Sequence, residues 1–269
     1  MDKIGFVGGG NMAEALIRGI IAAKVYPPEN IHVSDIRPER LEYLAGEYHV
    51  KTAANNSSLA AEMDILVLSV KPQNMAEMLQ GIKGSLNRDA LIISIAAGIR
   101  TQKISAILGQ LPIVRVMPNT PALIGEGASA LYANDLARPM LRQAERIFAS
   151  VGLAVFVEDE GLIDAVTAVS GSGPAYYFLL MEEMTKAATR LGLEQQVATE
   201  LVLQTAKGAA LLAKEAQKRG ETPAQLRKKV TSPGGTTEAA LKVFAEGSFG
   251  PLVEAALKKA CERSKELSA

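Results

Sequence analysis

The chain has 269 residues, of which 48% are hydrophobic and 22% charged, and its 29 Lys and Arg balance 29 Asp and Glu. This length allows one large domain or two ordinary ones, and the composition is typical of a globular protein with a sizeable core. The balanced charge gives no indication of nucleic-acid binding, which usually requires a basic excess. No apolar stretch approaches the ~20 residues of a membrane span. We therefore expect neither nucleic acid nor a membrane as a partner.

The cysteine and histidine counts restrict the covalent and metal chemistry of the chain. One cysteine, Cys261, excludes an intrachain disulfide, and together with His32 and His49 it cannot supply the spacing of a zinc site. We therefore predict no metal site. A single cysteine suits a reducing compartment, and the apolar run at the N-terminus is too short for a signal peptide, so we predict a cytoplasmic protein.

Short apolar runs alternate with amphipathic stretches along the first half. Buried strands are predicted over residues 4–7, 31–35, 64–70, 90–98 and 112–119, and helices over 11–23, 38–48, 73–82, 101–108 and 137–150. The stretches "ASALYAN" and "LAVFVE" predict one or two edge strands. This alternation predicts an α/β fold, with a Rossmann-type doubly wound parallel sheet over residues 1–157.

Residues 158–269 have a different character, because long helical patterns replace the strands. These patterns predict a C-terminal all-α domain. The apolar faces are broad: Phe178 and Leu179 widen the stripe of Tyr177, Leu180 and Met181. A partner chain or the first domain could cover such faces, and we favour a helical oligomerisation domain.

The first predicted strand is followed by Gly8-x-Gly10-x-x-Ala13 and then by a helical pattern. This is the context that a dinucleotide fingerprint requires: Gly8 makes a tight turn, Gly10 admits a pyrophosphate, and Ala13 lets the helix pack on the strand. A tight turn without a ligand is the alternative.

The end of the second strand, "SDIRPER", bears on the choice of cofactor. Asp35 could accept the ribose 2′-hydroxyl of NAD, whereas Ser34 and Arg37 could bind the 2′-phosphate of NADP. The residue types are compatible with NAD and with NADP. A solvated strand end without a ligand is a third alternative.

Five further stretches carry a family resemblance. They are "SVKPQN" (69–74), "SIAAG" (94–98), "RVMPNTPA" (115–122), "SGSGPAY" (170–176) and "TSPGGTTEAAL" (231–241). In this order and spacing they resemble pyrroline-5-carboxylate reductase, over nearly the whole chain from Lys3 to about Leu267. The resemblance implies the last step of proline biosynthesis, the NAD(P)H-dependent reduction of 1-pyrroline-5-carboxylate to L-proline. It also implies a homodimer or larger homo-oligomer, with the substrate site where two helical domains meet.

The resemblance implies cofactor contacts from several loops, with NADP favoured and NAD possible. The implied residues are Gly8, Gly10, Asn11, Met12, Ser34, Arg37, Asn56, Val70, Lys71, Pro72, Ala96 and Ala97, with Gly98 beside them. For Lys71, either the backbone or the ammonium group could matter. The loop from Pro118 to Pro121 is expected near the nicotinamide or, alternatively, serves as a connection.

The substrate residues implied by the resemblance are Ser232, Gly234, Gly235, Thr236, Thr237 and Glu221. A glycine loop feeding a helix N-terminus would present unpaired N–H groups to the substrate carboxylate. Thr237 is the expected catalytic residue, close to the imine nitrogen, although a helix cap is the alternative. Glu238 is expected to face outward. Lys228 and Lys229 occupy a segment where family members often have an acidic residue.

Two rival readings compete with this one. A β-hydroxyacid dehydrogenase would need a lysine soon after "SGSGPAYYF", but the next lysine is Lys186. A non-catalytic dinucleotide sensor would need the first glycine turn and would have no reason to keep "SPGGTT".

Overall fold

A computed structural model describes residues 2–268, and one sheet of eight strands dominates this part of the chain. The strands are β1 (Ile4–Val7), β2 (Ile31–Ser34), β3 (Lys51–Thr52), β4 (Ile65–Leu68), β5 (Leu91–Ser94), β6 (Ile113–Met117), β7 (Gly127–Ala133) and β8 (Gly152–Phe156). Their order is β3-β2-β1-β4-β5-β6-β7-β8.

The first six strands are parallel, in the order typical of dinucleotide-binding sheets. β7 runs antiparallel to β6, and β8 runs parallel to β7. The predicted doubly wound sheet is therefore confirmed, with a reversed pair added. Of the two stretches expected at an edge, only β8 is an edge strand, because β7 lies between β6 and β8.

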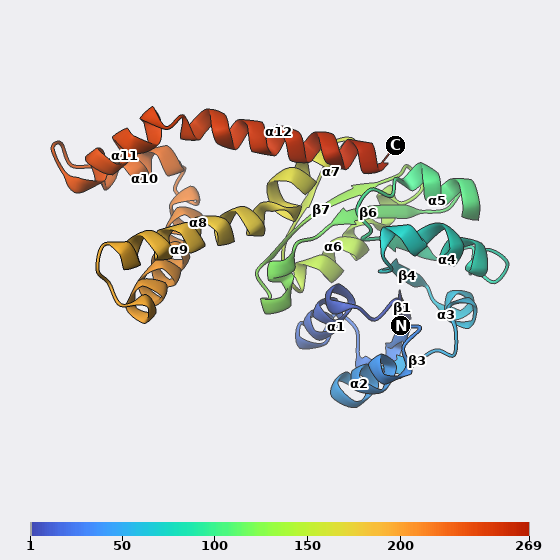
Figure 1. Cartoon of the computed structure of the whole chain (residues 1–269). Coiled ribbons are helices and arrows are strands. Elements are labelled where there is room, and N and C mark those ends of the chain that lie inside the picture. The colour runs from blue at the N-terminus through green and yellow to red at the C-terminus, as the bar shows by residue number, and fades with distance from the viewer. Residues whose placement is uncertain (1, 269) are drawn as a thin grey trace. The chain divides into compact units, whose positions relative to one another are not determined.

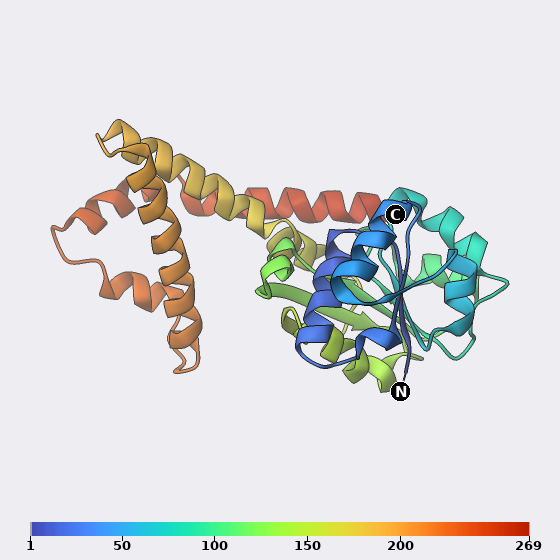
Figure 2. The same cartoon turned by 90° about the horizontal axis from the view of Figure 1, so that it is seen from below.

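Helices cover both faces of the sheet (Figures 1 and 2). One apolar cluster joins the sheet to α1 (Asn11–Ala22), α2 (Pro38–Tyr48) and α6 (Leu141–Ala149). The other joins it to α3 (Asn56–Glu62), α4 (Met75–Ile82) and α5 (Thr101–Leu108). Burial on both faces explains why the two central strands, β1 and β4, are apolar at every position.

The remaining elements are helical. Short 3₁₀ segments span Pro28–Asn30, Pro72–Asn74, Thr120–Ile124 and Arg138–Met140. After β8 come α7 (Leu162–Val166), a π-helical segment Thr167–Gly171, α8 (Gly173–Arg190), α9 (Gln195–Gln217), α10 (Pro223–Lys229), α11 (Thr236–Glu246) and α12 (Phe249–Ser268). Within residues 158–268 the structure has no strand, as predicted.

The contacts divide the chain into two compact units. One comprises Met1–Pro174 with Lys258–Ala269, and the other comprises Ala175–Leu257. This division differs from the sequence boundary after residue 157, because α7 and the end of α12 pack with the sheet.

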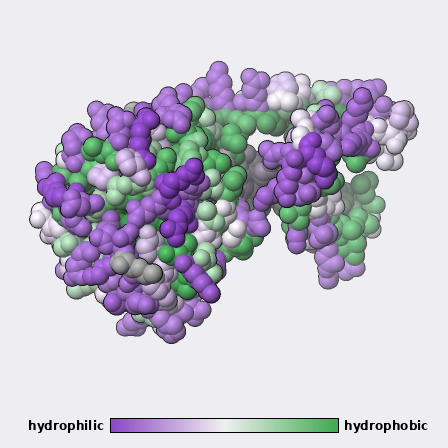
Figure 3. All heavy atoms as spheres, turned by 180° about the vertical axis from the view of Figure 1, so that it is seen from behind, coloured by the Kyte–Doolittle hydropathy of each residue, from purple (hydrophilic) through white to green (hydrophobic). Residues whose placement is uncertain are grey.

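The helical unit, Ala175–Leu257, buries few apolar side chains of its own. Its buried residues are Ala198, Val202 and Ala216. Large apolar side chains are exposed instead, among them Phe178 at 61%, and hydrophobic residues lie at its surface in Figure 3.

Candidate active site

The glycine turn after β1 has the geometry of a phosphate-binding turn. Gly8 has a φ of +97°, a conformation that favours glycine, and its N–H donates to the Ser34 carbonyl at 2.8 Å. A Cβ added at Gly10 would have no atom within 4 Å, so there is room for a ligand at the backbone. The N–H groups of Asn11, Met12 and Ala13 have no acceptor within residues 2–268. The turn therefore fits the pyrophosphate of a dinucleotide.

The strand ends beside this turn converge on it. Val7 pairs in register with Ser34 and Leu68, and Leu68 pairs with Ser94. The loops that follow these residues therefore lie at one edge of the sheet, where ligands of open α/β sheets bind.

The structure brings together two of the expected cofactor residues, Ser34 and Asn56. Ser34 is buried, and its hydroxyl donates to Asn56 Oδ1 at 2.8 Å. Arg37 is half exposed, and its Nε donates to Asp35 Oδ1 at 3.1 Å. Burial raises the pKa of Asp35, but hydrogen bonds from Arg37 and Gly9 more than offset this and leave the pKa below its usual value.

The loops after β4 and β5 complete the predicted cofactor edge. Val70 is partly buried, whereas Lys71 and Pro72 are exposed. Ala96 is buried and Ala97 is exposed. Gly98 has a φ of +73°, and a Cβ added there would lie 2.9 Å from the Leu267 carbonyl oxygen. The end of α12 thus packs closely against this loop.

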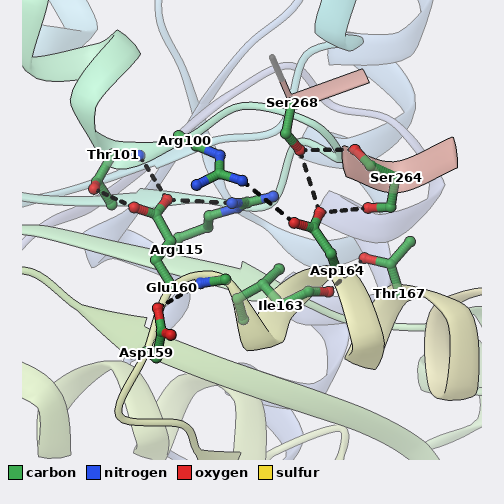
Figure 4. Close-up of polar contacts among 11 residues, drawn as sticks. Arg100, Thr101, Arg115, Asp159, Glu160, Ile163, Asp164, Thr167, Ser264 and Ser268 are labelled. Atoms are coloured by element: carbon green, nitrogen blue, oxygen red, sulfur yellow. Dashed lines mark hydrogen bonds and ion pairs between the residues drawn. The ribbon is translucent and has the colours of Figure 1, made fainter. Parts of the chain in front are cut away.

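A buried polar cluster fixes the same loop (Figure 4). Asp164 of α7 is fully buried and accepts from Ser264 at 2.7 Å and Ser268 at 3.3 Å, both on α12. Its second oxygen lies 3.4 Å from Arg100 Nη2. Glu160 accepts from the N–H and hydroxyl of Thr101, each at 2.8 Å, and from the buried Arg115 at 3.2 Å.

Two motif loops, "MPNTP" and "SGSGP", meet through Asn119. Its Nδ2 donates to the Ser170 carbonyl at 3.2 Å, and its Oδ1 accepts from the Ala128 N–H at 2.8 Å. The π-helical segment Thr167–Gly171, which the sequence did not indicate, sets the position of Ser170.

The loop Ser232–Thr237 differs in part from its predicted form. Gly234 has a φ of +71°, which favours glycine. The Gly234 N–H donates to Glu238 Oε2 at 2.7 Å, and the Gly235 N–H donates to the Ser232 carbonyl at 3.0 Å. These glycine N–H groups are therefore paired. The N–H groups of Thr236, Thr237 and Glu238 have no acceptor within the described chain.

Glu238 is exposed, as expected, but its carboxylate turns back onto the loop. Glu221 accepts a hydrogen bond from Lys229 and lies 3.7 Å from Arg219 Nε. The hydrogen bond from Lys229 lowers the pKa of Glu221. Lys229, which departs from the family pattern, thus holds this carboxylate.

Comparisons with known proteins agree with this geometry. A family model described as "Pyrroline-5-carboxylate reductase dimerisation" matches residues 160–267, and one described as "NADP oxidoreductase coenzyme F420-dependent" matches residues 3–98. The pyrroline-5-carboxylate reductase of Pseudomonas aeruginosa is 48% identical over 99% of this chain and 97% of its own length. That of Synechocystis is 42% identical over 98% of each chain.

A solved structure of a pyrroline-5-carboxylate reductase from Coxiella burnetii superposes with a TM-score of 0.93 at 40% identity, covering 100% of this chain and 99% of the other. The Plasmodium falciparum pyrroline carboxylate reductase, solved with NADP bound, gives a TM-score of 0.87 at 33% identity, with 100% and 98% covered.

The Rossmann-type sheet, its glycine turn and the helical unit define an NAD(P)-dependent oxidoreductase. Within that class, the chain belongs to the pyrroline-5-carboxylate reductase family. The resemblance noted in the sequence is therefore confirmed. A 3-hydroxyisobutyrate dehydrogenase from Mycobacterium tuberculosis is 16% identical with a TM-score of 0.53, a likeness of fold alone.

Proposed function

We propose that this chain reduces 1-pyrroline-5-carboxylate to L-proline with NADPH, and that NADH can also serve. The observation that carries the proposal is the open first turn of α1 beside Gly10, in a chain that matches reductases over its whole length. In the relative from Plasmodium falciparum, NADP is the bound dinucleotide.

The reduced nicotinamide, when bound, supplies a hydride to the ring carbon of the C=N bond. The ring nitrogen then gains a proton, so the imine becomes a secondary amine. We propose that the Thr237 hydroxyl lies close to this nitrogen and donates a hydrogen bond. A hydroxyl is a weak acid, so this proton comes from water, or the imine nitrogen already carries it when the hydride arrives.

We propose that the N–H groups of Thr236, Thr237 and Glu238 hold the substrate carboxylate. They are free at the start of α11, whereas those of Gly234 and Gly235 are paired. Ser232 and the two glycines then shape the loop. The Glu238 carboxylate would repel the substrate, and its hydrogen bond to Gly234 holds it on the loop. We propose that Glu221, which already accepts from Lys229 at one oxygen, contacts the substrate amine with its remaining acceptor sites.

We also propose that two or more copies associate through the helical unit, whose large apolar side chains are exposed in the single chain. The family model over residues 160–267 is named for dimerisation. Along residues 2–268, every helix is too short or too polar for a membrane span.

The proposal is tested by giving the purified protein 1-pyrroline-5-carboxylate with NADPH and, separately, with NADH. We expect oxidation of the nicotinamide and formation of an equal amount of L-proline, faster with NADPH. No turnover with either cofactor, while a known reductase works in the same assay, would refute the proposed reaction.

A further inference from the structure

The peptide group between Gly8 and Gly9 is held on both edges by side chains from other strand ends. The Ser69 hydroxyl, after β4, lies 2.6 Å from the Gly8 carbonyl oxygen, its nearer acceptor, and 2.9 Å from the Val7 carbonyl oxygen. Asp35 Oδ2, after β2, accepts from the Gly9 N–H at 2.8 Å. The carbonyl and N–H of a trans peptide point in opposite directions, so these two contacts fix the plane of the peptide.

The next peptide group, between Gly9 and Gly10, is held on one edge only. Arg40 Nε donates to the Gly9 carbonyl. Arg40 is itself paired with Glu14, which also accepts hydrogen bonds from Tyr43 and Tyr48. The opposite edge of this peptide is the Gly10 N–H, which has no acceptor within residues 2–268. Arg40 therefore directs the Gly10 N–H toward the open side of the turn.

The packing around Gly9 leaves this turn little freedom. A Cβ added at Gly9 would lie 2.8 Å from Leu44 Cδ1 and 3.5 Å from Asp35 Oδ2. The middle glycine, which the fingerprint does not specify, is thus enclosed by β2 and α2.

We propose that Asp35 and Arg40, with Ser69, are positioning residues that hold the glycine turn ready for the cofactor phosphates, and that Asp35 does not select between NADH and NADPH. This inference rests on the proposed use of a nicotinamide cofactor. The Asp35 side chain is only 8% exposed, and each of its oxygens already accepts a hydrogen bond. Arg37 also balances its charge at 3.1 Å, which weakens repulsion of a 2′-phosphate.

The two roles for Asp35 predict different binding constants. The pyrophosphate is common to NADH and NADPH, so a disordered glycine turn weakens both by the same factor. A carboxylate that contacts the ribose would instead favour NADH, and its removal would change the ratio of the two dissociation constants.

The experiment measures both dissociation constants by isothermal titration calorimetry on the full-length protein without substrate. Asp35→Ala is expected to weaken NADPH and NADH alike, by about tenfold, the effect typical of one lost charged hydrogen bond. Asp35→Asn keeps an amide oxygen for the Gly9 N–H and should lose less. Arg40→Gln tests the second peptide and should also weaken both cofactors equally. Asp135→Ala, on a side chain that is 95% exposed, is the matched control.

A change of tenfold or more in the NADH to NADPH ratio in the Asp35 variants, or tighter NADPH binding, would overturn the proposal. Unchanged affinity for both cofactors in Asp35→Ala and Arg40→Gln would overturn it as well. Should Asp35→Ala fail to fold, the dissociation constants of Asp35→Asn and Arg40→Gln test the positioning role in its place. Wild-type protein that binds neither cofactor would refute the proposed function and this inference together. If the wild type turns over 1-pyrroline-5-carboxylate while the variants give one of the contrary results, the proposed function stands and this inference alone fails.

Discussion

Thr237 illustrates how the structure narrows a choice that the sequence left open. Sequence reasoning gave Thr237 a catalytic role or a helix-capping role. The N-cap of α11 is Gly235, and no side-chain hydrogen bond caps this helix. Thr237 is the second residue of α11, and its hydroxyl is not needed for the cap that N-cap residues usually provide. The capping alternative is therefore wrong in this structure, while the catalytic role stays a proposal.

Thr237→Ala is expected to lower kcat by about 10- to 100-fold, the range for a lost hydrogen bond or proton relay at the reacting atom. The melting temperature should stay unchanged, because the hydroxyl caps no helix. Steady-state kinetics and thermal unfolding check the two expectations.

Thr199→Ala is the matched control, since Thr199 is a half-buried threonine of α9 whose hydroxyl donates to its own helix, at the Gln195 carbonyl. Wild-type kcat in Thr237→Ala would contradict the assignment.

Glu14 offers a test by pH. Burial raises the pKa of Glu14, but hydrogen bonds from Arg40, Tyr48 and Tyr43 more than offset this and leave the pKa below 4.5. The folded protein therefore binds the proton of Glu14 less readily than the unfolded chain does. The resulting stabilisation is complete above the unfolded pKa and is lost as the pH falls through the folded pKa.

Glu14→Gln should lower the free energy of unfolding by about 1–2 kcal/mol at neutral pH. The difference from wild type should shrink as the pH falls below 4.5, which urea unfolding at a series of pH values can measure. The exposed Glu42→Gln on α2 is the control. A difference that does not depend on pH would show that the charge of Glu14 is not its source.

The turns and strand ends that carry the candidate site residues could be predicted from the sequence more readily than the directions of the side chains. The spacing of Gly8, Gly10 and Ala13 correctly predicted the turn. The sequence could not show that Asp35 points at Gly9, 26 positions earlier. Such contacts depend on how strands align in the sheet, and a carboxylate after β2 suits both a ribose and a backbone N–H.

Among the elements, those with a continuous apolar run or a clear helical period were predicted. β3 was missed because its two residues, Lys51 and Thr52, are both exposed. α3 was missed because its seven residues begin with a polar run, which resembles a loop. The π-helical segment has no sequence signature, since it depends on local packing.

The end of α12 is an element whose packing the sequence did not indicate. Its serines, Ser264 and Ser268, look like solvent-exposed positions, yet both bond the buried Asp164 (Figure 4). A buried carboxylate must have partners, because an unpaired charge in the interior is costly. These contacts hold α12 against the loop after β5, where Gly98 meets the Leu267 carbonyl.

Asp164→Ala should therefore lower the free energy of unfolding by about 3 kcal/mol, because it leaves the buried Ser264 hydroxyl and Arg100 without their acceptor. Ser264→Ala, which removes one hydrogen bond, should cost about 1 kcal/mol. Urea unfolding at one fixed protein concentration measures both.

The control for this pair is Asp135→Ala, whose side chain is 95% exposed and should change stability by less than about 0.5 kcal/mol. Equal losses in Asp164→Ala and Asp135→Ala would contradict the role given to the buried cluster.

At the scale of the whole molecule, the two compact units differ in how many of their apolar side chains they bury. The unit that contains the sheet has two clusters of fully buried side chains. The helical unit has three buried apolar residues in its described length, all on α9. The sequence predicted its broad apolar faces correctly. It could not show what covers them, because a single chain carries the same pattern whether a partner or another part of the protein is responsible.

We expect that a second copy covers these faces, since exposed apolar area of this extent is unusual in a monomer. Light scattering at micromolar concentration should then give at least twice the chain mass of 28.5 kDa. Phe178→Asp, which places a charge on a side chain that is 61% exposed in the single chain, should shift the protein toward monomers, because burying that charge would be costly. Leu136→Asp, at a side chain 51% exposed in the unit that contains the sheet, should leave the mass unchanged. A monomeric wild type would contradict association, and dissociation by Leu136→Asp alone would place the interface outside the helical unit.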